Sequence, residues 1–414
     1  MTLSTATPVR LRRFVPAVSA VTLALSATYA AVLVVLLPAQ VAALDPDAKA
    51  TNLAIVTTVS FALTVAAQPL IGARSDRTGG RLGRRAPWML GCAVVAAVLL
   101  VTLGAVHTLA ALAVVWALAQ FALNGVDIAA SAAVPDQVPV ARRGSVFAVL
   151  GFVAVLGAAL GVVAAGEATD ARGPYASLAV AVVVVAGLYV LLDRDRPVVA
   201  PAVPAGRARW AGVREAAATM SRTPVFARGL AARLLFGLAY QLVYAFQLYV
   251  LVDHVGVPED QAQAVLVRLT VGVLVAILVG AVVAGWWSDR VRDRRPFMAG
   301  ASALLAVALV VPVVVPTVAG MAVFAVLKGL AFGAFAACGT ALATEAMPHG
   351  GATAGRDLGV YNVATNVPQT VAPALAAALV GSAGGYPALF AVAAVVAVLA
   401  LWVSARIPAP APEA

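Results

Sequence analysis

The sequence GARSDR at residues 72–77 decides the fold, because it returns as GWWSDR at residues 285–290. The aspartates of the two copies, Asp76 and Asp289, are 213 residues apart, about half of the 414-residue chain. Each copy follows a long apolar run and is itself followed within ten residues by paired arginines and a proline. A repeat at this spacing indicates that the molecule consists of two similar halves.

The composition indicates that lipid surrounds most of the chain. Of all residues 63% are hydrophobic and only 11% are charged, whereas soluble domains contain about 25% charged residues. No water-soluble fold of this length could bury so much apolar surface. The net charge of +10 does not indicate a nucleic-acid partner, because the arginines form short clusters between apolar runs.

Twelve apolar runs can each supply a membrane-spanning helix, which needs roughly 20 apolar residues. The sequence therefore predicts an all-α membrane protein with twelve transmembrane helices in two pseudo-symmetric six-helix bundles. A secretory signal is an alternative for the first run, but its 24 residues are too many for the apolar h-region of a signal peptide and suit a spanning helix. The expected spans are residues 14–37, 52–72, 87–106, 109–134, 144–166, 174–192, 226–252, 263–286, 296–315, 317–344, 357–381 and 386–406.

The spans divide the chain into five segments. They are an N-terminal tail (1–13), a first bundle (14–192), a polar linker (193–225), a second bundle (226–406) and a C-terminal tail (407–414).

Basic residues predict the orientation of these segments. Twenty-three of the 28 lie in the tails or in the loops that follow even-numbered spans, and only Lys49 and Arg172 lie in the opposite loops. The positive-inside rule then places both termini in the cytoplasm. The strong preference for arginine over lysine is typical of a high-GC bacterial genome, so we expect a bacterial plasma membrane.

The repeated loop is the expected cytoplasmic gate. Its aspartate can accept hydrogen bonds from the N-terminus of a facing helix, and its arginines can pair with acids across the two halves. The alternative is that these arginines only anchor the topology at lipid phosphates. The candidate gate residues are Gly72, Asp76, Arg77, Arg81, Arg84, Arg85, Asp289, Arg290, Arg294 and Asp357.

These loops resemble the signature of the major facilitator superfamily, with the pattern G-x-x-x-D-R…R-R after spans 2 and 8. More narrowly, residues 75–88 resemble the corresponding loop of sucrose/proton symporters and their glycoside–cation symporter relatives. Asp127 and Ser131 resemble the fourth helix of that group, and residues 355–369 resemble the eleventh. The resemblance implies a secondary transporter in which helices 1, 4, 7 and 10 line a central cavity and the fourth-helix aspartate takes part in proton coupling.

The chain also departs from the sucrose carriers. Ala129 and Ala130 replace a double asparagine, and the fifth span has no arginine. The resemblance therefore does not fix the sugar or the charge partner of Asp127.

Four charged residues fall inside the expected spans and away from their ends: Asp127, Arg233, Arg268 and Lys328. Each costs about 3 kcal/mol or more at the bilayer centre, so we expect each to face a polar cavity. Arg268 can instead reach the headgroups from the outer part of its span. Asp127 is the predicted proton-binding residue, and Arg233 and Lys328 are its predicted charge partners because a nearby cation favours the charged carboxylate.

Polar residues share helix faces with these charges. Gln120, Asn124, Asp127 and Ser131 are spaced by 4, 3 and 4 residues, and the first and seventh spans carry similar faces. Amides could read the hydroxyls of a sugar while aromatic rings stack on its C–H faces; alternatively, the polar groups only join helices. The candidate cavity residues are Ser26, Tyr29, Gln120, Asn124, Tyr240, Tyr244, Gln247, Asn362, Asn366 and Gln369.

The function predicted from these features is sugar/proton symport by alternating access. Proton-coupled efflux is the alternative, although the fifth span lacks the Gly-Pro pair often found in drug/proton antiporters. A transport-derived sensor or a membrane enzyme is more remote, because no catalytic triad, P-loop or metal-ligand spacing is visible. We therefore expect no enzyme activity and no cofactor, and a monomer whose partners are the solute, protons and the bilayer.

Overall fold

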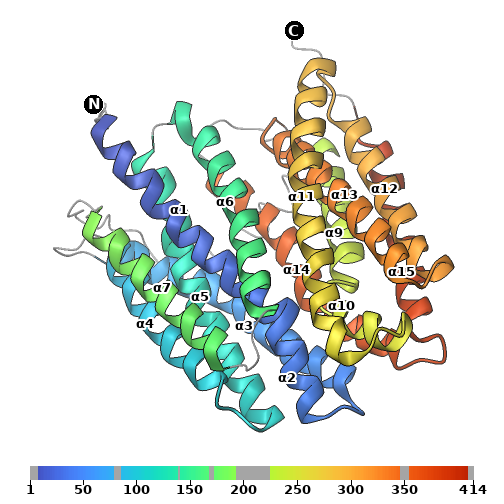
Figure 1. The fold of residues 1–414 in the computed structure, drawn as a ribbon. Helices are drawn as coiled ribbons and strands as arrows, with labels where there is room; N and C mark the ends of the chain where they lie inside the picture. The colour runs from blue at the N-terminus through green and yellow to red at the C-terminus, as the bar shows by residue number, and fades with distance from the viewer. Residues whose placement is uncertain are drawn as a thin grey trace. The chain divides into compact units, whose positions relative to one another are not determined.

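A computed structural model describes residues 8–78, 85–138, 140–166, 172–192, 224–345 and 354–408. These residues form helices and contain no strand (Figure 1). The chain divides into two compact units, Met1–Ala202 (unit 1) and Val203–Ala414 (unit 2). The expected linker lies almost wholly outside the described residues, as do most of the two expected tails, although the first helix already begins at Pro8.

Every expected span has a helical counterpart. Unit 1 contains α1 (Pro8–Ala30), the π-helix η1 (Ala31–Leu36), α2 (Leu37–Leu44), α3 (Lys49–Arg77), α4 (Ala86–Leu103), α5 (Leu109–Gln137), α6 (Val140–Gly166) and α7 (Arg172–Leu192). Unit 2 contains α9 (Pro224–Leu242), α10 (Gln247–Tyr249), the π-helix η2 (Val250–His254), α11 (Glu259–Val291), α12 (Arg295–Val314), α13 (Val318–Glu345), α14 (Ala354–Val380) and α15 (Gly385–Ala405).

The two closest divisions between expected spans are confirmed. The helix α4 ends at Leu103, and Thr108 caps α5 by accepting a hydrogen bond from the backbone N–H of Ala111. The second division falls between Val314 and Val318. Among the described residues, nine helices are long and apolar enough to span a membrane, and the bent pair of α9 with α10 and η2 provides a tenth.

Apolar side chains cover the outside of these helices as well as the inside. On α4, Val94, Val95 and Val98 are exposed, whereas Ala93 and Ala96 are buried. A soluble protein would place polar residues on the exposed stripe. The apolar outer surface is what a helix needs when lipid is its solvent.

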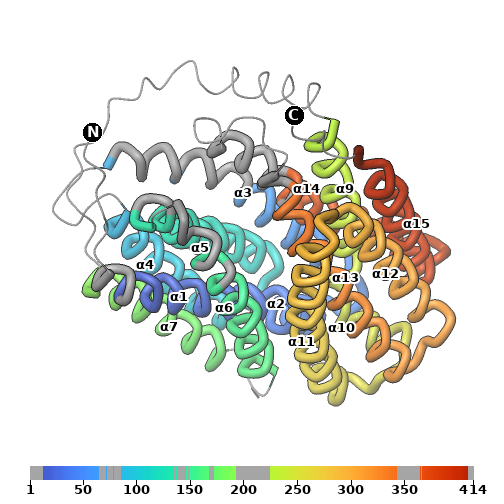
Figure 2. Tube along the Cα trace, turned by 90° about the horizontal axis from the view of Figure 1, so that it is seen from above, coloured from blue at the N-terminus to red at the C-terminus, as the bar shows by residue number. Residues whose placement is uncertain are grey.

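Glycines bring neighbouring helices close together in unit 1. The helix α1 packs against α6 and α7 (Figures 1 and 2). A Cβ at Gly157 or Gly161 of α6 would collide with the backbone of Leu23 or Ala27 on α1. Small residues allow this close approach, which is a common way for membrane helices to pack.

Unit 2 uses the same device between α11 and α13, which run side by side (Figure 2). A Cβ at Gly280 of α11 would meet the backbone of Leu330, and one at Gly333 of α13 would meet the backbone of Ile277. The helix α9 packs against α14 and α15. The close α11–α13 contact fixes the position of α13, which carries Lys328.

Candidate functional site

Asp127 is exposed near the middle of α5. The Ser131 hydroxyl, one turn further along, is hydrogen-bonded to its carboxylate, and Tyr29 of α1 lies close enough to interact with it electrostatically. Asp127 is nine residues from Leu118, which is also exposed. Nine residues are about two and a half helical turns, so the two side chains point in opposite directions and Asp127 does not share the apolar outer face of Leu118.

Two polar groups, one on α1 and one on α5, are buried without a hydrogen-bond partner. The Tyr29 hydroxyl and the Gln120 amide oxygen make no hydrogen bond within the part of the chain that the structure describes. Unpaired buried polar atoms are rare in proteins, and each costs about 1–3 kcal/mol. The Asn124 side chain, by contrast, donates to the Thr64 hydroxyl at 3.3 Å and to the backbone carbonyl of Gln120 at 2.8 Å. The polar residues of α1 and α5 thus include Asp127 and two groups, the Tyr29 hydroxyl and the Gln120 amide oxygen, that can still form hydrogen bonds.

Part of the predicted face on α1 has a packing role. The Thr22 hydroxyl donates to the Val18 carbonyl at 3.0 Å, which satisfies it within the helix. Ser26 is half-buried one turn before Tyr29. The π-helix η1 begins two residues after Tyr29 and is followed by Pro38. Such π-helical stretches are frequent at functional sites, so the backbone irregularity adjoins the tyrosine and not the threonine.

In unit 2 the side chain of Lys328 is 1% exposed, in α13. Its Nζ lies 5.1 Å from the centre of the Tyr240 ring and 5.0 Å from that of Phe324. Tyr240 in turn packs on Phe332, with ring centres 4.6 Å apart. Each cation–π contact contributes about 0.5–2 kcal/mol, whereas burying an ion costs several kcal/mol. The rings therefore offset only part of the cost of the charge.

The helix α9 stops at Leu242, and the next helical residue is Gln247, with a bend of 46° between the two parts. The break contains Tyr244, whose ring centre is 6.1 Å from that of Tyr240. The buried Gln247 side chain donates to the Tyr244 carbonyl at 3.1 Å, satisfying one backbone group that the break leaves free. Irregular backbone at membrane depth is tolerated where it is buried in protein or lines a water-filled cavity. Tyr244 and Gln247, both predicted cavity residues, lie at this point.

The remaining predicted cavity residues are less well defined. Asn366 and Gln369 are half-buried on α14. The side chain of Asn362 lies outside the described residues. Arg233 is half-buried on α9, and Arg268 is exposed on α11, where its guanidinium donates to the Ala264 carbonyl at 3.3 Å. That position agrees with an Arg268 that reaches the headgroups.

In the second copy of the repeated loop, the described contacts join residues of the loop to one another. The Asp289 carboxylate pairs with Arg294 at 2.8 Å, and Arg294 also donates to the Ser288 hydroxyl at 3.1 Å. The guanidinium of Arg290 lies 3.5 Å from the centre of the Trp286 ring. This ion pair links the end of α11 to the residue that precedes α12, and the predicted gate role of Asp289 stays a prediction.

The first copy of the loop is only partly described. The surroundings of Gly72 and the side chains of Asp76, Arg77, Arg81, Arg84 and Asp357 lie outside what the structure describes. Nearby, Arg85 is buried at the start of α4, and the Trp88 indole donates to the Thr78 hydroxyl at 2.7 Å. The proposed gate therefore stays a prediction for both copies.

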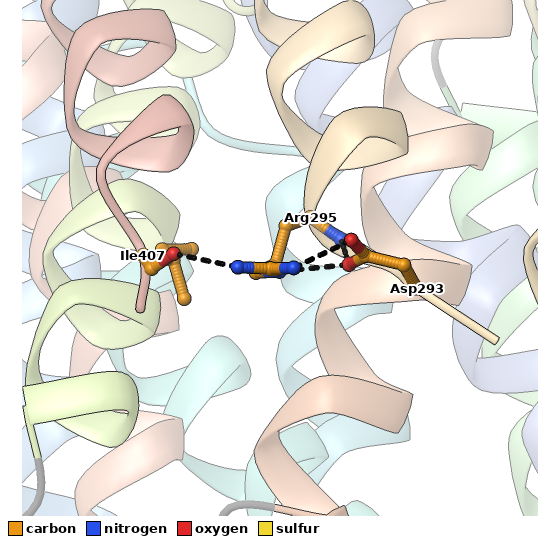
Figure 3. A network of polar contacts seen from close by, with 3 residues as sticks. All are labelled: Asp293, Arg295 and Ile407. Carbon is orange, nitrogen blue, oxygen red and sulfur yellow. Dashed lines mark hydrogen bonds and ion pairs between the residues drawn. The ribbon is translucent and has the colours of Figure 1, made fainter. Parts of the chain in front are cut away.

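The sequence reasoning missed a clamp beside the second loop (Figure 3). Arg295 donates to both carboxylate oxygens of Asp293, at 2.8 and 2.7 Å, and to the Ile407 carbonyl at 3.4 Å. The bond from Arg295 lowers the pKa of the Asp293 carboxyl. Arg228 donates to the Arg406 carbonyl at 2.6 Å. Together these arginines tie the residues after α15 to α9 and α12, and the spacing of Asp293 and Arg295 was the available signal.

Comparisons with known proteins agree with this architecture. The family model described as the Major Facilitator Superfamily matches residues 19–277 and 242–414. The crystal structure of the nucleoside transporter NupG superposes with a TM-score of 0.73 at 13% identity, covering 95% of this chain and 99% of that one. A bacterial homologue of the human lysosomal transporter Spinster, inward-facing and unoccupied, gives 0.72 at 14% identity, covering 98% and 100%. No curated protein sequence matches. At these identities the likeness shows the fold.

Proposed function

The chain belongs to the Major Facilitator Superfamily, and from that premise we propose that it is a proton-coupled symporter of a small hydroxylated solute of the sugar class. It works by alternating access as a monomer in a bacterial plasma membrane, with both termini in the cytoplasm. Its membership and its apolar helices make it a multi-pass membrane transporter. The coupling ion, the solute and the direction are the parts that we propose.

The observation that carries the proposal is the position of Asp127. The carboxylate accepts a hydrogen bond from Ser131 and lies near the unpaired Tyr29 hydroxyl, and it forms no ion pair with the described residues of unit 1. A carboxyl group that is bonded to a serine hydroxyl and not to a fixed cation can change its protonation state without breaking a salt bridge. We assign proton binding to this group. The pairing of Asp127 with Arg233 and Lys328 of unit 2, which the sequence suggested, stays a prediction.

We propose solute contacts from the polar and aromatic groups of each unit. The Tyr29 hydroxyl and the Gln120 amide oxygen supply hydrogen-bonding groups that lack a protein partner. Tyr240 and Tyr244 supply ring faces beside the break in α9. Hydroxyls and C–H faces alternate on a sugar, so this combination of groups suits it. Asn124, Gln247, Asn366 and Gln369 complete the proposed set.

The driving force is adequate for accumulation. One proton that crosses 100 mV releases about 2.3 kcal/mol, which corresponds to roughly fiftyfold accumulation.

Transport into proteoliposomes with an imposed inward proton gradient tests the coupling, using labelled D-glucose, D-galactose, sucrose and D-glucuronate. We expect the wild type to accumulate at least one of them, and Asp127→Asn to exchange it across the membrane without accumulating it. Glu259→Gln is the matched control, because Glu259 is an exposed acid in the first turn of α11. Accumulation by Asp127→Asn would exclude the assignment. Solute-driven acidification of the outer medium, in place of alkalinisation, would indicate efflux by antiport.

A further inference from the structure

The ammonium of Lys328 is buried at a depth from which it cannot reach the membrane surface. It lies ten residues beyond Val318, where α13 begins, a rise of about 15 Å along the helix. The apolar core of a bilayer is about 30 Å thick. This places Lys328 near the middle of the core, and the burial of its side chain (1% exposed) shows that it does not extend outwards.

No described residue supplies Lys328 with a hydrogen-bond acceptor or a carboxylate. Its polar contacts in unit 2 are with the faces of the Tyr240 and Phe324 rings. The carboxylates of unit 2 whose side chains are described all lie at helix ends, in η2 or in the α11–α12 loop: Asp253, Glu259, Asp260, Asp289 and Asp293. No described carboxylate of unit 2 therefore compensates an ammonium at this position.

We propose that the counter-charge of this ammonium is a carboxylate of the transported solute, so that the solute is a small hydroxylated carboxylic acid and not a neutral sugar. An ammonium has three N–H donors and no acceptor, and the aromatic rings satisfy the charge in part but none of the donors. A carboxylate supplies the opposite charge and two acceptor oxygens in one group. The inference rests on the proposed function, since it names the class of solute that uses this site.

The surroundings of Lys328 also suit the rest of such a solute. Tyr244, half-buried at the break in α9, offers an apolar ring face to C–H groups and lies beside the buried ring of Tyr240. Tyr240 contacts both the ammonium and the second tyrosine. A solute whose carboxylate meets Lys328 would therefore place its carbon skeleton against these rings. A neutral sugar would use the rings but leave the ammonium without a counter-charge, which makes Lys328 the residue that selects for acids.

Binding to the purified full-length chain tests the proposal, with D-glucuronate and D-gluconate as acidic probes and D-glucose as their neutral counterpart. We expect the wild type to bind at least one acid at least tenfold more tightly than glucose. Lys328→Met should weaken acid binding at least tenfold and leave glucose binding unchanged, whereas Lys328→Arg should retain part of the preference. Lys49→Met is the control, because Lys49 is the only other lysine in the chain and lies at the start of α3.

Several outcomes would overturn the proposal. They are equal affinity for the acids and glucose, binding of neither acid, or an equal loss for acids and glucose in Lys328→Met. Recovery of acid binding in the double variant Asp127→Asn, Lys328→Met would make Asp127 the counter-charge of Lys328 and would also overturn it. Proton-driven accumulation of a neutral sugar alone would remove the carboxylate site and leave symport standing. Acid binding that depends on Lys328, without any response of transport to the proton gradient, would leave the carboxylate site standing and remove proton symport.

Discussion

Replacing Gly161 by alanine should destabilise unit 1, because the added methyl group has nowhere to go. A Cβ at this position would lie 2.6 Å from the Ala27 Cα on α1 and would also collide with the Ala27 carbonyl. Both are backbone atoms, so no side-chain rotation relieves the clash and the two helices have to move apart. Gly151 is the matched control on the same helix, since a Cβ there meets nothing within 4 Å.

The magnitude follows from two opposing effects. Overpacking in a closely packed interior costs about 1–3 kcal/mol, and alanine recovers up to about 1 kcal/mol through its better helix propensity. We expect a net loss of about 1–2 kcal/mol for Gly161→Ala and a gain of about 0.5–1 kcal/mol for Gly151→Ala. At about 2–4 °C for each kcal/mol in a domain of 150–250 residues, the two variants should differ in melting temperature by several degrees.

Tryptophan fluorescence during thermal unfolding in detergent measures this difference. The retained monomeric elution of both variants on size exclusion would show that the comparison is between folded proteins. Equal melting temperatures for Gly161→Ala and Gly151→Ala would refute the reasoning, because α1 and α6 would then not be in backbone contact at Gly161. A lower temperature for Gly151→Ala than for Gly161→Ala would refute it more strongly.

Two further predictions concern polar contacts at the helix ends. Arg295 lowers the pKa of Asp293 in the folded protein. Asp293 therefore stabilises the fold above its unfolded pKa of about 3.9 and loses that effect as the pH falls through the lowered value. Asp293→Asn should reduce the melting temperature near pH 7 by the equivalent of at most about 1 kcal/mol and have little effect in melts below about pH 3. Tyr386→Phe should cost about 0.5–1.5 kcal/mol, because the Tyr386 hydroxyl donates to the Asp253 carboxylate at 2.7 Å; if its effect persists in an Asp253→Asn background, the hydrogen bond is not its cause.

Hydropathy and charge were enough to predict the twelve helices, but not their irregularities. The division between α12 and α13 could be predicted because one apolar run would have exceeded the bilayer thickness. The break between Leu242 and Gln247 could not, since the residues within it are as apolar and aromatic as those on either side. The π-helix η1 escaped notice for the same reason. Both depend on how the backbone is packed, which hydropathy does not report.

The candidate site shows a similar limit. Helical spacing predicted that Asp127 and Ser131 share a face, and their hydrogen bond follows from that spacing. The proximity of Tyr29 and Asp127 depends on how α1 crosses α5, which no local pattern encodes. Phe324 lies four residues before Lys328, so its ring contact could have been found from the sequence. The contact of Lys328 with Tyr240, on another helix, could not.

The two proposals together give a physical reason for coupling. An empty carrier holds a negative Asp127 and a positive Lys328, and the buried charge of Lys328 is costly without compensation. A bound proton neutralises the first, and a bound carboxylate compensates the second. A carrier loaded with only one of the two still holds one uncompensated charge, whereas the fully loaded carrier holds none.

The passage of an acid anion with one proton then moves no net charge, so the pH gradient and not the membrane potential would drive accumulation. For a neutral sugar the same proton would carry a charge across and both gradients would contribute. The identity of the solute and the nature of the driving force are therefore one question, and Lys328 decides it.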